Sequence, residues 1–163
     1  MSMFEDRHYR WRETYFVLFD AAKRPTLAQA RKAIAALGPR FHVKNVRGDE
    51  QERVESLTLL APDDFAALDI AYLEGDEVLE QRTQLSDDLK SLAVEPEDRA
   101  RLKRFRQCTA RFDVLHFEQV AEGEEEEEEE EEMLDPGSML IVLEALAKLT
   151  DGIAVDPQSG TML

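Results

Sequence analysis

The sequence is poor in the features that mark disulfide-linked or membrane-spanning proteins. Its 163 residues include one cysteine, Cys108, so no internal disulfide can form, and a lone thiol is typical of a reducing compartment. No run of apolar residues is longer than five, and the pattern predicts neither a signal peptide nor a membrane-spanning helix. We therefore expect a cytoplasmic protein that does not associate with membranes.

Glycine and histidine are also scarce, which limits the sites that bind cofactors. None of the seven glycines is spaced as G-x-G-x-x-G or G-x-x-x-x-G-K, so neither kind of phosphate-binding loop is predicted. His42 and His116 fall on expected strands, but no third ligand lies at a spacing that would complete a metal site with them. We expect neither a cofactor nor a metal.

The charge is strongly acidic and unevenly distributed. The formal net charge is −16, although residues 1–47 carry ten Lys and Arg against four Asp and Glu. A basic cluster with interleaved aromatic residues also lies between Arg99 and Arg111. The net negative charge nevertheless opposes non-specific binding to phosphates, so a nucleic-acid partner is not expected.

Nine consecutive glutamates, Glu124 to Glu132, lie in a segment between an expected strand and an expected helix. Like charges four residues apart repel one another, so residues 122–134 are predicted to form a disordered acidic loop. Three interpretations remain open. The run is an inert solvated loop, a lid over the basic cluster, or a contact surface for a basic partner.

Hydrophobic periodicity and turn residues predict a regular series of strands and helices. Thr26 and Gln29 form a capping-box pattern at the start of the first helix, and Gly38 marks its end. The expected strands cover residues 14–19, 41–46, 54–61, 67–73, 111–120 and 152–156, and a final hairpin ends at 161–163. The expected helices cover residues 26–37, 137–150 and a segment from residue 76 that Pro96 interrupts.

The first expected strand is apolar on both faces. Tyr15, Val17 and Phe19 alternate with Phe16 and Leu18. If either face were exposed to solvent, large side chains would lose the burial that contributes about 1.5–3 kcal/mol each to the stability of the fold. We therefore expect helices on one face, and the C-terminal half or a second copy of the chain on the other.

These elements predict an α+β protein with one folded domain. The expected architecture is a two-layer sandwich whose mainly antiparallel sheet has helices on one side. The expected order is ferredoxin-like, β-α-β-β-α-β, with an appended α-β unit. Residues 1–12 are expected to be a partly ordered arm, and residues 13–163 the domain that contains the acidic loop.

No catalytic motif stands out, so we expect a non-catalytic cytoplasmic binding or protein-interaction module, with regulation among the roles such a module serves. Its expected partners are a basic protein or a second copy of the chain. The alternative is a small hydrolase or transferase whose site gathers Asp113, His116, His42 and Cys108 in three dimensions. In that case nearby arginines would activate the thiol. A pocket holding these four residues would favour the enzyme, and their dispersal would favour the module.

Overall fold

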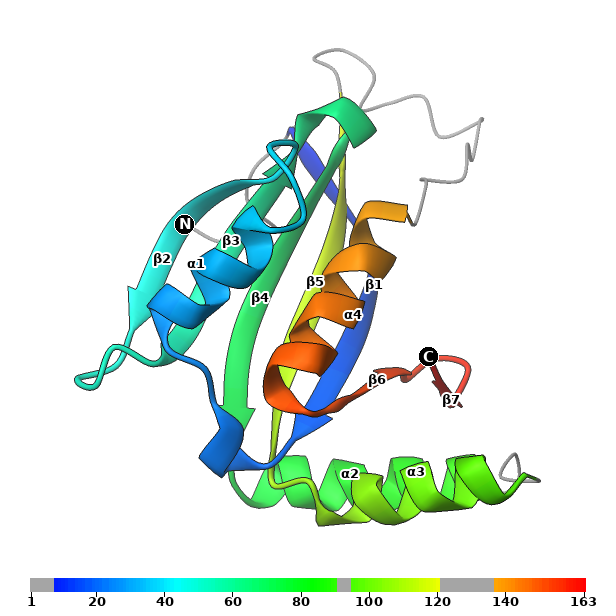
Figure 1. Ribbon diagram of the computed structural model, residues 1–163. Coiled ribbons are helices and arrows are strands. Elements are labelled where there is room, and N and C mark those ends of the chain that lie inside the picture. Colours follow the sequence, from blue (N-terminus) through cyan, green and yellow to red (C-terminus); the bar gives the residue numbers. More distant parts are fainter. Residues whose placement is uncertain (1–7, 91–94, 121–136) are drawn as a thin grey trace, which may run out of the picture.

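Seven strands and four α-helices make up the part of the chain that the structure describes. The computed structural model describes residues 8–90, 95–120 and 137–163 (Figure 1). The strands are β1 (Tyr9–Phe19), β2 (His42–Gly48), β3 (Val54–Ala61), β4 (Ala66–Glu74), β5 (Ala110–Gln119), β6 (Ile153–Asp156) and β7 (Thr161–Met162). The helices are α1 (Leu27–Ala35), α2 (Asp76–Lys90), α3 (Pro96–Gln107) and α4 (Gly137–Thr150). Each of these strands and helices corresponds to one expected from the sequence.

The seven strands form one sheet in the order β2-β3-β4-β5-β1-β6-β7. All neighbouring strands run antiparallel, which confirms the expected mainly antiparallel sheet. The strand that comes first in the sequence lies inside the sheet, between β5 and β6. This position explains why β1 is apolar on both faces.

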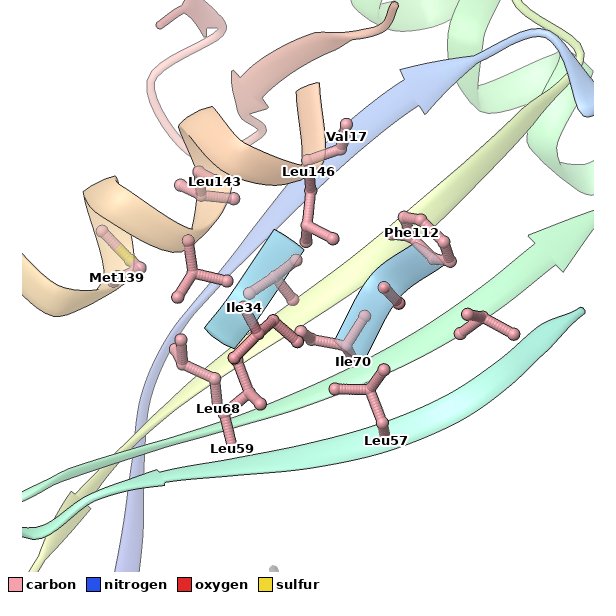
Figure 2. Packing of buried hydrophobic residues seen from close by; sticks show 14 of the residues in the cluster. Val17, Ile34, Leu57, Leu59, Leu68, Ile70, Phe112, Met139, Leu143 and Leu146 are labelled. Atoms are coloured by element: carbon pink, nitrogen blue, oxygen red, sulfur yellow. The ribbon is translucent and has the colours of Figure 1, made fainter. Parts of the chain in front are cut away.

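Helices α1 and α4 cover one face of the sheet, which we call the α1/α4 face (Figure 1). Figure 2 shows Ile34 of α1 and Leu143 of α4 among side chains that rise from the strands, including Leu59, Ile70 and Phe112. The start of α1 has the predicted capping box, because the Thr26 hydroxyl accepts from the backbone of Gln29 and the Gln29 side chain accepts in return. Local capping and long-range packing thus specify the same helix.

Helices α2 and α3 pack at one end of the sheet and contact its opposite face, the α2/α3 face (Figure 1). Leu18 of β1 is buried there with Leu89 of α2 and Phe105 of α3. Val17 and Phe19 are fully buried on the α1/α4 face. The expected covering of both faces is therefore confirmed for residues 17–19, with α4 from the C-terminal half on one side and the α2–α3 pair on the other.

The expected sandwich with every helix on one side differs from the observed structure. Leu18, Ile153 and Val155 form an apolar surface on the α2/α3 face, and α2 and α3 bury it. The ferredoxin-like order is not observed either, because three successive strands, β2, β3 and β4, separate α1 from α2. What the structure has is a mixed α/β arrangement around one antiparallel sheet.

The N-terminal boundary also needs correction. Residues 9–12 belong to β1 rather than to a partly ordered arm, and Arg10 in this segment donates to Glu118 of β5 at 2.8 Å. The pairing of β1 with β5 continues to Tyr9, through an irregularity between Trp11 and Glu13. The predicted acidic loop at 122–134 lies outside the described residues, as do residues 1–7.

Candidate functional site

The structure does not bring together the four residues proposed for an enzyme site. Asp113 and His116 both lie on β5, but they are three residues apart and therefore point to opposite faces. His42 lies on the edge strand β2, three strand spacings or roughly 14 Å from β5. Cys108 precedes β5 and is buried in the cluster beneath α2 and α3. Since the four residues are dispersed, no site is assembled from them.

Cys108 is not an activated nucleophile. It is 6% exposed, and burial raises the pKa of its thiol to about 11, although Arg104 and Arg82 act in the opposite direction. Its Sγ donates to the Arg104 carbonyl at 3.4 Å. It lines a cavity of about 160 Å³ beside Asp151, but the thiol there stays protonated at neutral pH. The arginines nearby do not outweigh the loss of water.

His116 is fully buried on the α1/α4 face of β5. Its Nδ1 lies 3.3 Å from Oε1 of Glu13 on β1, and Nε2 has no hydrogen-bond partner among the described residues. Burial lowers the pKa of the imidazole, whereas the hydrogen bond and the charge of Glu13 oppose this effect. A neutral ring that donates from Nδ1 to Glu13 accounts for this arrangement.

Two carboxyl groups on the α2/α3 face hold their protons more tightly than usual. Burial raises the pKa of Asp69 on β4 and of Asp113 on β5. Register places Asp69 opposite Leu115 and Asp113 opposite Ala71, so the two residues are diagonal neighbours roughly 7–8 Å apart. Sequence reasoning missed Asp69, although an acid inside the apolar stretch Ala66–Glu74 was a signal that could have identified it.

Each of these carboxyl groups has a partner within the protein. The Thr58 hydroxyl donates to Asp69 at 3.1 Å, and Nε of Arg111 donates to Asp113 at 2.7 Å. Arg111 is 5% exposed, stacks over the ring of Phe16 and also donates to Gln81 of α2. These contacts form two separate polar links, one between β3 and β4 through Asp69 and one between β5 and α2 through Arg111.

The basic cluster from Arg99 to Arg111 is largely used to hold the fold together. Arg101 donates to the Leu163 carbonyl at 2.6 Å, and Arg104 forms an ion pair with Asp151 at 3.2 Å. Arg106 donates to the hydroxyl of Ser86 on α2 at 2.6 Å. These contacts tie α3 to α2, to the turn after α4 and to Leu163, which follows β7.

A surface groove of about 540 Å³ lies beside α4, and we call it the α4 groove. Its lining includes Leu143 and Ala147 of α4 and Ala154 of β6. Leu140 and Leu163, which also line it, are 44% and 47% exposed, and adjoining exposed apolar side chains are a feature of interaction surfaces. The groove therefore presents apolar surface that the described chain leaves uncovered.

Four charged side chains border the α4 groove, two of each sign. Lys148 pairs with Glu144 at 3.0 Å along the exposed side of α4, and Arg104 pairs with Asp151 at 3.2 Å beyond its end. Their charges sum to zero, whereas the whole chain carries −16. The groove is thus an apolar and locally neutral surface on an acidic protein.

Residues 8–90, 95–120 and 137–163 contain no group of three or more His, Cys, Asp or Glu side chains that could hold a metal ion. No helix within those ranges is both long enough and apolar enough to cross a bilayer. Comparisons with protein-family models, curated proteins and solved structures found no match for this chain.

Proposed function

We propose that this protein is a non-catalytic protein-interaction module and that the α4 groove is its binding surface. The observation that carries the proposal is the uncovered apolar lining of the groove, with Leu140 and Leu163 on its borders. Leu140 and Leu163 are already about half buried, so covering the rest of both against a partner contributes about 1.5–3 kcal/mol in total before the entropic cost of binding. The groove is also large enough to receive side chains of a partner segment.

The proposal includes a cytoplasmic location and a regulatory role. A single buried thiol, Cys108, is compatible with a reducing compartment. Regulation by association requires only that a partner be held and released, which a shallow apolar surface can do. A basic protein remains the partner proposed for Glu124–Glu132, a segment outside the described residues.

Selection from a random peptide library tests the binding surface. The wild-type protein should enrich peptides with apolar anchors, and Ala147→Trp, which fills the groove, should lose them. Ala28→Trp is a matched control, because Ala28 is exposed on α1, away from the groove. Enriched peptides that bind all three proteins equally, or no enrichment at all, would contradict the proposal.

A hydrolase or transferase is the second candidate, and the raised pKa values of Asp69 and Asp113 are the observation that favours it. Carboxyl groups with perturbed pKa values are common at catalytic sites. A panel of ester and phosphoester substrates tests this possibility. Turnover by the wild-type protein that Asp113→Asn abolishes, with the fold intact, would make the enzyme the better assignment.

A further inference from the structure

We propose that a second copy of this chain occupies the α4 groove, with the two α4 helices antiparallel about a twofold axis near residue 146. The inference rests on the proposed function, because it names the partner for the same groove. A twofold contact uses one surface patch twice, so that patch must be complementary to itself. Both the charges and the apolar residues along α4 meet this condition.

The charges of α4 become complementary when the helix is turned end to end. Leu140, Glu144 and Lys148 are exposed and spaced four residues apart, so they lie along one side of the helix. In the antiparallel pair, Glu144 of each copy faces Lys148 of the other. The two intrahelical pairs then become one group of four alternating charges.

The apolar residues match in the same register. Leu140 lies one turn before Glu144, and Gly152 lies about one turn beyond Lys148. The same twofold rotation that places Glu144 of one copy opposite Lys148 of the other also places Leu140 at the Gly152 end of the other copy's groove. Ala154 and Leu163 line the groove there. The exposed leucine of one copy thus fills the apolar surface of the other.

Local neutrality favours a second copy over a charged partner. A groove built for a basic or an acidic segment would carry an excess of the opposite sign, but the borders of this groove balance. The remaining −16 on each copy repels from a distance. Added salt screens that repulsion, so self-association should strengthen with salt, whereas binding to a basic partner would weaken.

Sedimentation velocity of the wild-type chain over a dilution series is the first test. The proposal predicts a reversible monomer–dimer equilibrium whose dimer fraction rises with protein concentration and with added sodium chloride. A chain that stays monomeric at every concentration and salt level overturns it. In that case peptide binding in the groove would still support the proposed function, so the two claims fail separately.

Charge reversal tests the register. Glu144→Lys or Lys148→Glu alone places like charges opposite one another and should weaken self-association by roughly tenfold or more. An equimolar mixture of the two variants should form a heterodimer about as stable as the wild-type dimer, because every contact across the axis then joins opposite charges. Both positions are largely exposed, so each variant should keep the wild-type circular dichroism spectrum.

The mixture separates this contact from a general effect of charge. Both variants lose the same intrahelical ion pair, which contributes about 0.3–0.5 kcal/mol to helix stability. A dimer that neither substitution weakens, or a mixture that fails to restore association, would show that another surface or another register is used.

Discussion

Replacing His116 should remove a specific acid sensitivity of the fold. In the unfolded chain this imidazole takes up a proton near its ordinary pKa of 6.5, whereas burial lowers its pKa in the folded protein. Between those two pKa values the unfolded state binds more protons, so the free energy of unfolding falls as the pH falls. The contribution of the neutral ring to the free energy of unfolding is therefore fully present above pH 6.5 and is lost as the pH drops toward the folded-state pKa.

The magnitude follows from one proton and one buried ring. A single group changes the free energy of unfolding by at most about 1.4 kcal/mol per pH unit. At neutral pH, His116→Leu removes Nε2, a buried polar atom that has no partner among the described residues and costs about 1–3 kcal/mol. It also removes the contact with Glu13, which contributes about 1 kcal/mol. The difference makes the variant about 0–2 kcal/mol more stable than the wild type near pH 7.5.

Urea unfolding followed by far-ultraviolet circular dichroism between pH 7.5 and about 5 measures the difference, above the range where ordinary carboxyl groups titrate. Subtracting the stability-against-pH curve of His116→Leu from that of the wild type separates the effect of His116 from that of Glu13, Arg12 and Glu118, the charged groups that act on it. His42→Gln, a change on the exposed edge strand, should leave the wild-type profile in place. If His116→Leu loses stability toward acid as steeply as the wild type, the assigned role of the buried ring is wrong.

Three further substitutions test other parts of the structure. Asp69→Asn should raise the unfolding midpoint at pH 7, by about 2–4 °C for each kcal/mol gained, because it replaces a carboxylate that burial disfavours. At acid pH the wild-type carboxyl group is protonated and this cost is absent, so the gain should disappear there. A lower midpoint at pH 7 would contradict this interpretation. Cys108 should react with iodoacetamide more slowly than the cysteine of an exposed peptide, and fast alkylation at neutral pH would count against a buried thiol. Cys108→Ser should lower the free energy of unfolding by only about 1 kcal/mol, because the hydroxyl can still donate to the Arg104 carbonyl. Replacing Glu124–Glu132 by four Gly and Ser residues should leave the melting temperature nearly unchanged, since loop closure changes by only about 0.6 kcal/mol per doubling of length, and an unfolded variant would show that the run supports the fold.

Local signals predicted the elements well. Thr26 and Gln29 specify the start of α1 through side-chain contacts that form within one turn, and Gly38, with φ at 117°, ends that segment as expected. Alternating apolar residues likewise identified β5 and the strand that became β4. Such signals depend on neighbouring residues, so they can be recognised without knowledge of the tertiary fold.

The layer arrangement depends on contacts that local patterns do not encode. The sequence shows that Leu18 must be covered, but it does not say that Leu89 and Phe105 are the residues that cover it. The proposed catalytic residues show the same limit. Asp113 and His116 point to opposite faces only if β5 runs without a break through both residues, and the sequence alone did not establish this. The α4 groove was also missed, since it combines α4 with the distant Leu163 and Arg104.

Methyl NMR spectra of the labelled protein, recorded as its concentration is raised and again with a library-selected peptide, would locate the binding surface. We predict that the methyl signals of Leu140, Leu143 and Leu163 shift in both titrations, while those of Leu73 and Leu115 on the α2/α3 face stay in place. Shifts confined to the α2/α3 face, next to Asp69 and Asp113, would contradict the assignment of the α4 groove as the site of interaction.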